Sequence, residues 1–68
     1  MSEIVFLVED AVEGGILARA LGHSIFTDAD SYEELRTRVR EAVHLHFEEG
    51  ARPSVIRLHY VKDEVLAA

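Results

Sequence analysis

IVFLV, residues 4–8, is an uninterrupted run of β-branched, aliphatic and aromatic side chains. Its composition and its short length favour a strand over a helix. Side chains on a strand alternate between two faces, so Ile4, Phe6 and Val8 take one face and the two residues between them take the other. The run therefore predicts a central strand that is apolar in both directions.

Two turns follow this strand and divide the next residues into a meander. The pair Gly14-Gly15 is a hairpin signal, and residues 16–21 suit a second strand. A second tight turn at residues 22–24 leads into a short third strand at residues 25–27. We therefore expect three consecutive antiparallel strands.

A helix is predicted after the third strand. Ser31 and Glu34 have the spacing of a capping box, in which the hydroxyl serves a backbone N–H and the carboxylate reaches back to the cap. Residues 32–49 suit the helix itself, and Gly50 is a typical residue just past its end. Helical spacing gathers its apolar residues on one face. These residues are Tyr32, Leu35, Val39, Ala42, Val43 and His46, with Phe47 at the edge of the face.

The order of elements predicts the topology. Pro53 closes the loop after the helix, and residues 54–61 read as a fourth strand. The helix returns the chain along the sheet, so the fourth strand should lie parallel to the first through a right-handed crossover. We expect an α+β fold with element order β-β-β-α-β, sheet order 3-2-1-4 and one helix on one face. The chain, residues 1–68, is expected to be one domain, with residues 62–68 frayed or forming a short helical turn.

One helix covers only one face of such a sheet, and the other face is also apolar. Contiguous exposed apolar area usually marks an interface, so we expect homo-oligomers. The alternative is that Val65 and Leu66 in the C-terminal segment fold over this face. The residues predicted to mediate self-association are Val5, Leu7, Leu17, Leu21, Val55 and Val61.

Charge is distributed unevenly along the chain, whose net charge is −6. Residues 1–34 carry eight acidic residues and one basic residue, whereas residues 35–68 carry five acidic and six basic residues. An acidic surface repels nucleic-acid phosphate and attracts basic partners, so no direct nucleic-acid binding is expected. Turns at one end of the sheet should gather six acids into a rim that binds a basic protein, although turn chemistry, helix capping and solubility also explain acids there. The rim residues are Glu9, Asp10, Glu13, Asp28, Asp30 and Glu33.

Histidines are the only candidate metal ligands other than carboxylates, because the chain has no cysteine. His44 and His46 point in opposite directions on the helix and cannot share an ion. His46 is interpreted as a core or interface residue, while His23 lies in a turn and His59 on a strand. We therefore expect no metal site and no cofactor.

The predicted order of elements also begins the ribonuclease H fold, whose activity needs carboxylates that converge on two metal ions. The centres of strands 4–8 and 54–61 and the inner helix face hold no acid. No serine lies in a nucleophile-elbow motif either. The sequence therefore predicts a non-enzymatic protein.

The apolar run at residues 4–8 is also too short for a signal peptide or a membrane span. The lack of cysteine fits a reducing compartment. We expect a cytoplasmic protein that does not associate with membranes.

Three stretches resemble HicB-type antitoxins. EGGILARA at residues 13–20 is similar to that family's acidic, Gly-Gly hairpin, and DSYEEL at residues 30–35 is similar to the start of its helix. REAVHLHF at residues 40–47 is similar to the helix's continuation, so the resemblance covers about residues 4–49. The turn at residues 22–24 is shorter than the family's usual Pro-Gly turn, and Ala29 stands where the family has Gly.

The resemblance implies a partial ribonuclease H-like fold without its activity, oligomerisation, and capture of a small, basic, RNA-cleaving HicA-type toxin. Many members append a DNA-binding domain, for which this sequence leaves no room before its end at Ala68, so we expect no operator binding. The alternative is an orphan structural or regulatory homo-oligomer without a toxin partner.

Overall fold

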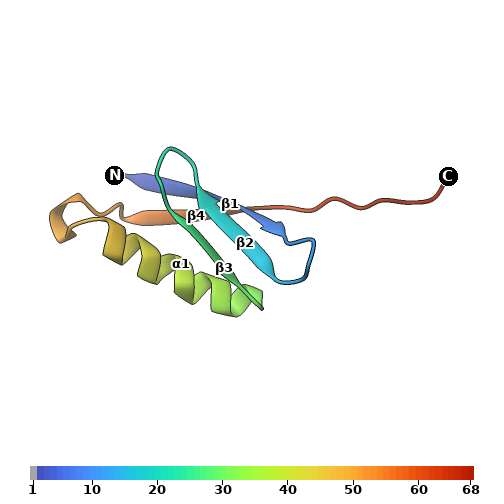
Figure 1. Cartoon of the computed structure of the whole chain (residues 1–68). Helices are drawn as coiled ribbons and strands as arrows, with labels where there is room; N and C mark the ends of the chain where they lie inside the picture. Colours follow the sequence, from blue (N-terminus) through green and yellow to red (C-terminus); the bar gives the residue numbers. More distant parts are fainter. Residues whose placement is uncertain (1) are drawn as a thin grey trace.

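Four strands form one mixed sheet, and one helix packs on one side of it (Figure 1). The computed structural model describes residues 2–68. A short 3-10 helix, Glu49–Ala51, lies between the long helix and the last strand. The other elements are β1 (Glu3–Asp10), β2 (Ile16–Ala20), β3 (Phe26–Ala29), α1 (Tyr32–His46) and β4 (Val55–Val61).

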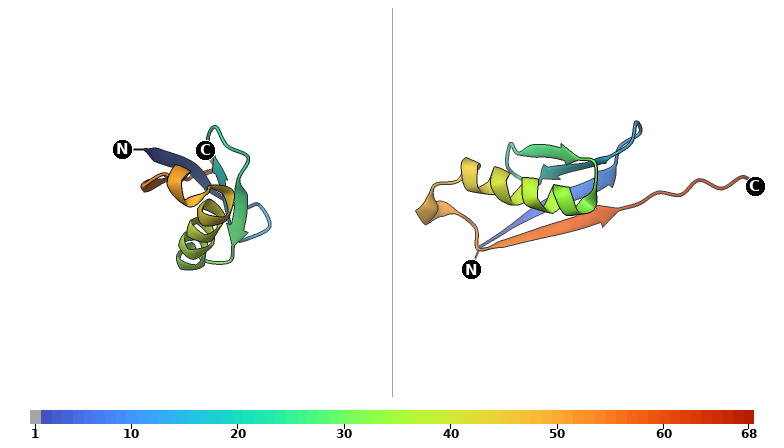
Figure 2. Two further views of the ribbon diagram at one scale, coloured as in Figure 1. Left: turned by 90° about the vertical axis from the view of Figure 1, so that its left-hand side faces the viewer. Right: turned by 90° about the horizontal axis from the view of Figure 1, so that it is seen from below.

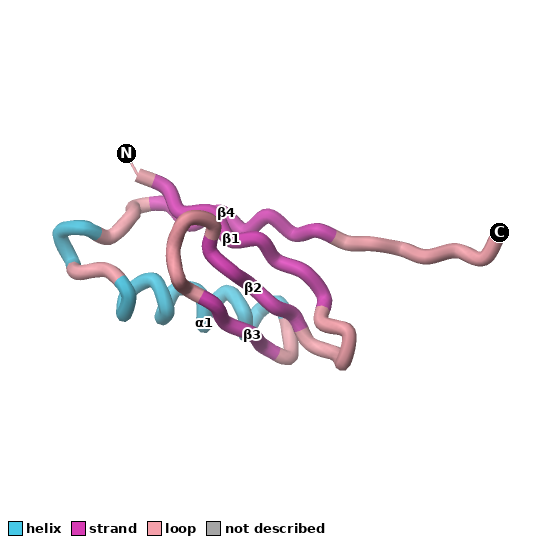
Figure 3. Tube along the Cα trace, turned by 45° about the horizontal axis from the view of Figure 1, so that its top comes forward, coloured by secondary structure: helices cyan, strands magenta, loops and turns pink. Residues whose placement is uncertain are grey.

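The strand order is β3-β2-β1-β4, as the sequence predicts (Figure 3). β1 pairs antiparallel with β2 and parallel with β4, and β2 pairs antiparallel with β3. The parallel register sets Phe6 opposite Leu58, while the antiparallel register sets Phe6 opposite Ala20. β1 is therefore a central strand, and β3 and β4 are the two edges.

The core lies between the sheet and α1, which covers one face only (Figure 2). Phe6 and Leu35 are fully buried at its centre, where large side chains of β1 meet those of the helix. Alternation along β1 places the intervening residues on the other side of the sheet, away from α1. The buried apolar residues are Ile4, Phe6, Val8, Ile16, Ala18, Ala20, Ile25, Ala29, Leu35, Val39 and Val43.

The predicted capping box is present at the start of α1, with one difference. The Glu34 backbone N–H donates to Ser31 Oγ at 3.1 Å. The Glu34 carboxylate accepts from the backbone N–H of Asp30 at 3.0 Å, one residue before the cap. This bond and the Arg38 guanidinium lower the pKa of Glu34 from its usual value. The arrangement fixes the β3–α1 turn at the end of the sheet.

The helix ends earlier than predicted, at His46 and not at residue 49. Phe47 has extended backbone angles, and its N–H donates to the Val43 carbonyl at 3.1 Å. The reason is packing, because the partly buried Phe47 ring lies against the core and does not continue the exposed helix. β3 also begins one residue later than predicted, at Phe26, and extends to Ala29.

The sequence predicts that His46 is a core or interface residue, and the core alternative is wrong because its side chain is exposed in the last turn of α1. Its ring instead contacts Phe47 and His23, with centroid distances of 4.9 Å and 6.0 Å. The interface alternative stays a prediction.

Residues 62–68 contain no helical turn and extend away from the body of the protein (Figure 1). Val65 is 94% exposed and Leu66 is 76% exposed. The alternative in which these two residues cover the second sheet face is therefore wrong for the single chain.

Candidate protein-binding surfaces

The open sheet face, on the side of the sheet opposite α1, has an apolar surface. Leu21 is 48% exposed and Phe26 is 64% exposed. Alternation and register place all six predicted self-association residues on this face, where Val5, Leu7, Leu17 and Val55 are half-buried and Leu21 and Val61 are exposed.

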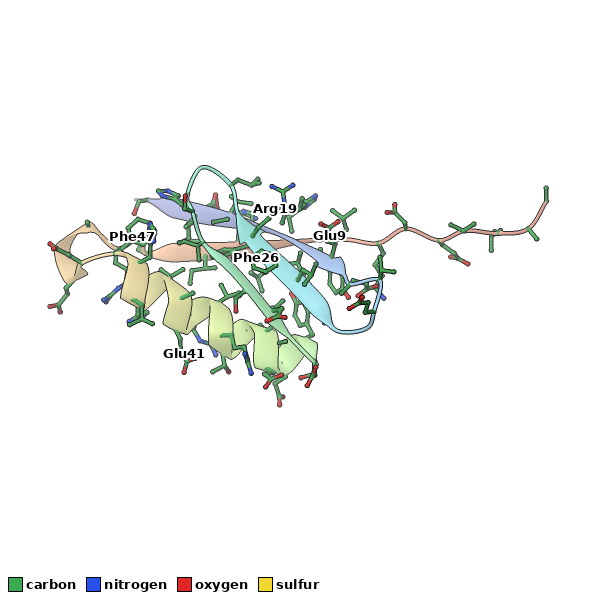
Figure 4. The ribbon with its side chains drawn as sticks, in the orientation of Figure 1. Glu9, Arg19, Phe26, Glu41 and Phe47 are labelled. Atoms are coloured by element: carbon green, nitrogen blue, oxygen red, sulfur yellow. The ribbon has the colours of Figure 1, made fainter. Side chains whose placement is uncertain are left out.

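Phe26 belongs to this face as well, although the sequence did not indicate it. The register sets Phe26 opposite Arg19, both labelled in Figure 4. It also sets Arg19 opposite Leu7. A three-residue predicted strand shows no readable alternation, so only the actual pairing reveals which way Phe26 points. The result is a row of side chains across the sheet in which an exposed aromatic ring adjoins a guanidinium.

Charged groups surround the apolar positions of the open sheet face. Arg57 Nε lies 2.8 Å from Glu3 Oε1 across the β1–β4 pair. The register also sets Leu17 opposite both Glu9 and Asp28. Apolar and charged side chains are therefore interspersed on this face, with Arg19 between Leu7 and Phe26 and Glu9 between Leu17 and Val61.

The acidic rim forms where the β1–β2 hairpin meets the β3–α1 turn. Glu13, Asp28 and Asp30 line one shallow hollow together with the two hairpin glycines. Gly14 and Gly15 have φ values of +101° and +83°, which a residue with a side chain rarely adopts. A Cβ on Gly15 would lie 2.9 Å from the Ala29 carbonyl oxygen. This close approach holds the acidic hairpin against the end of β3.

The other three predicted rim residues have different surroundings. Glu33 is exposed in the first turn of α1, and Glu9 is exposed at the border of the open sheet face. Asp10 is engaged within the chain: it accepts a 2.5 Å hydrogen bond from the Tyr60 hydroxyl, and Lys62 Nζ lies 4.0 Å from its other oxygen. The bond to Asp10 raises the pKa of Tyr60, because the carboxylate stabilises the protonated phenol. Asp10 therefore contributes less unpaired charge than the sequence suggested.

An aromatic stack reinforces the contact at Asp10. The rings of Tyr32 and Tyr60 lie parallel, with centroids 5.4 Å apart, and Lys62 Nζ lies 5.5 Å from the Tyr60 centroid. This stack joins the start of α1 to the end of β4, so it connects the helix to the strand that the helix otherwise leaves partly uncovered.

The histidines do not gather into a metal site. No group of three or more His, Asp or Glu residues within the described part of the chain has the geometry to hold an ion. His23 does approach His46 and Phe47, with its centroid 5.1 Å from that of Phe47. Sequence spacing gave no sign of this cluster, because the two histidines come from a turn and a helix end.

A second hollow, which the sequence also did not indicate, lies between α1 and β4. Arg36, Arg40 and His44 recur every fourth residue along α1, and Arg52 follows the 3-10 helix. The four-residue spacing of these basic side chains can be read from the sequence. Their position beside β4 cannot, because it depends on where the helix lies across the sheet.

No helix among residues 2–68 combines the length and the apolar character needed to cross a membrane.

The fold and surfaces define a small α+β protein in which one helix covers one face of a mixed sheet. A protein of Archaeoglobus fulgidus described as a UPF0150 protein is 58% identical over 52 residues, which cover 76% of this chain and 77% of that relative. A UPF0150 protein of Thermotoga maritima is 40% identical over 65 residues, which cover 96% of this chain and 91% of that relative.

The chain therefore belongs to the UPF0150 family. No protein-family model matches it, and no solved structure matches it.

Proposed function

We propose that this protein is a non-enzymatic, antitoxin-like binding module of the HicB type. It self-associates through the open sheet face and captures a small, basic, RNA-cleaving protein of the HicA type on its acidic rim. Membership of the UPF0150 family is compatible with this function, and the resemblance to HicB antitoxins falls on the hairpin and helix that build the rim.

The uncovered second face of the sheet is the observation that carries the proposal. Exposed apolar residues on that face, Leu21, Phe26 and Val61 among them, have no cover from residues 2–68. Removing apolar surface from water yields about 25 cal/mol per Å², so covering this face by another subunit is favourable. The open sheet face then serves as a binding surface for other protein subunits.

The absence of buried charge in the described core supports a binding role over a catalytic one. No polar or charged side chain among residues 2–68 is buried. A hydrolytic centre of the ribonuclease H kind needs carboxylates held inside a site, whereas the acids here lie on exposed turns. Exposed acids attract basic partners and speed their association.

Self-association is tested by light scattering on the wild-type protein at micromolar concentration. We expect a mass that is a multiple of the 7.6 kDa of one chain. A Phe26→Asp, Leu21→Asp variant should lower that mass, while Leu45→Asp, at an exposed position of α1, should not. A wild-type mass of 7.6 kDa would contradict the role assigned to the open sheet face.

Partner capture is tested by native purification followed by mass spectrometry. We expect one small basic protein to co-purify, and its RNA cleavage to stop when the chain is added back. A Glu13→Lys, Asp28→Lys variant should lose this inhibition, whereas Glu41→Lys, on the outward side of α1, should retain it (Figure 4). Recovery of the homo-oligomer alone would remove the toxin partner from the proposal.

A further inference from the structure

The groove between α1 and β4 is a second uncovered surface, on the helix side of the sheet. It has a volume of about 460 Å³. Its exposed apolar lining comes from Ile56 and Leu58 of β4, which lie beside the buried Val39 and Val43 of the helix. The two β4 residues are only half-buried, because α1 packs against β2 and β3. The groove therefore offers apolar surface for a partner to cover.

The rim of this groove is basic although the protein as a whole is acidic. Arg36, Arg40, His44 and Arg52 line it, and no acidic residue does. Among residues 2–68, no carboxylate lies within 4.0 Å of the three arginines. Among the same residues, no group accepts a hydrogen bond from Arg52 Nε, which is shielded from solvent. An occupant with acidic groups next to apolar ones would satisfy this lining.

β4 borders the groove and is an edge strand. One row of its backbone N–H and C=O groups has no neighbouring strand, which makes the edge a template for an added strand. Its outward face, away from the groove, carries Arg57 and His59. Basic residues therefore lie on both faces of this edge.

Residues 62–68 have the matching composition. Asp63 and Glu64 are followed by Val65 and Leu66, and all four are exposed on an extended segment. In a strand these residues alternate, so each face carries one acid and one aliphatic side chain whatever the register. Either face then complements a basic rim with an apolar floor.

We infer that residues 62–68 of one chain dock along the β4 edge and groove of a second copy. The pairing is reciprocal and antiparallel, which a two-fold dimer satisfies because each copy offers the same edge and the same segment. Seven extended residues span about 23 Å, comparable to the length of β4. The segment holds no Gly or Pro, so a tight reversal onto its own β4 edge is disfavoured.

The first test measures the mass of the full chain and the backbone relaxation of residues 62–68 by NMR across a concentration series. We expect the segment to become rigid as the dimer forms. A Val65→Asp, Leu66→Asp variant should weaken dimerisation by about tenfold or more, since burial of one aliphatic side chain corresponds to that factor. A Val12→Asp, Leu45→Asp control adds the same charge at exposed positions outside the groove and should leave the rigidity unchanged.

Charge exchange is the second test. A variant with Arg36→Glu and Arg40→Glu should release residues 62–68 from the groove. Docking should return when Asp63→Arg and Glu64→Arg are added to that variant. Arg38→Glu, on an arginine that pairs with Glu34 outside the groove, is the control for reversed charge. Failure of the exchanged charges to restore docking would overturn the inference, because a structural defect cannot be repaired in that way.

Three other results would overturn it, and the first and third of them leave the proposed function intact. A dimer whose residues 62–68 stay mobile would mean association through the open sheet face alone. A rigid segment in a monomer would mean docking within one chain. Binding of inorganic phosphate at Arg36 and Arg40 without any change in the segment would mean that the groove is a small-anion site.

Discussion

Substituting Gly15 by alanine should damage the protein far more than the same substitution at Gly14. Both residues have positive φ, so alanine at either position adopts a strained backbone that costs about 1–2 kcal/mol. At Gly14 nothing lies within 4 Å of the added Cβ. At Gly15 the Cβ would lie 2.9 Å from the Ala29 carbonyl oxygen, a backbone atom that cannot swing aside. Overpacking of this kind costs a further 1–3 kcal/mol, roughly.

The two losses can be separated by urea unfolding followed by circular dichroism at one protein concentration. With a slope of about 1 kcal/mol per molar urea, Gly14→Ala should lower the midpoint by about 1 M and Gly15→Ala by about 3 M. A chain of this size has a total stability of roughly 5 kcal/mol, so the second variant should retain about 2 kcal/mol of it. Gly14→Ala serves as the matched control for backbone strain.

Equal midpoints for the two variants would refute the reasoning, since they would show that the hairpin moves away from β3 without cost. In that case the contact that brings Glu13 close to Asp28 and Asp30 would be flexible, and the acidic rim would not be preformed. A much larger loss of stability for Gly15→Ala than for Gly14→Ala would instead indicate a rigid rim.

Two further predictions concern titration. The pKa of Glu34 is lowered in the folded state, so its stabilising contribution is present above the usual pKa of 4.5 and is lost as the pH falls through the folded-state pKa. The difference in unfolding free energy between wild type and Glu34→Gln should therefore be present at neutral pH and vanish in acid. A difference that does not depend on pH would contradict this. The pKa of Tyr60 is raised above 10.0 by Asp10, so Asp10→Asn should let that phenol ionise at lower pH in an ultraviolet absorbance titration, and an unchanged titration curve would exclude the hydrogen bond as the cause.

The topology could be predicted because its signals are local. The doubly apolar run at residues 4–8, the glycine pair and the capping box each specify one element or turn. The rule for right-handed crossovers then leaves one position for β4. The observed order and the parallel β1–β4 pairing confirm this inference.

The lateral position of the helix could not be predicted, and the groove depends on it. Periodicity shows which face of α1 is apolar, but not whether that face lies over β2 and β3 or over β1 and β4. Arg52 is also far from Arg36 in sequence, so only the fold brings them to one groove.

Two phenylalanines, Phe47 and Phe26, account for two of the other differences between prediction and structure. Phe47 fits a helical pattern, yet its ring packs best with the backbone extended, which ended α1 early. Phe26 lies on a strand too short for its alternation to be read. In both cases tertiary packing overrides the local preference.

The parallel register of β1 and β4 also has a consequence for how the protein folds. It pairs Glu3 with Val55, so the central strand β1 gains its second neighbour from a distant part of the chain. Such long-range pairing is slow compared with formation of the hairpin and the helix. On the ribosome, the border of β1 that pairs with β4 would stay unpaired until β4 had emerged, and a chaperone that shields this border would raise the yield of native protein.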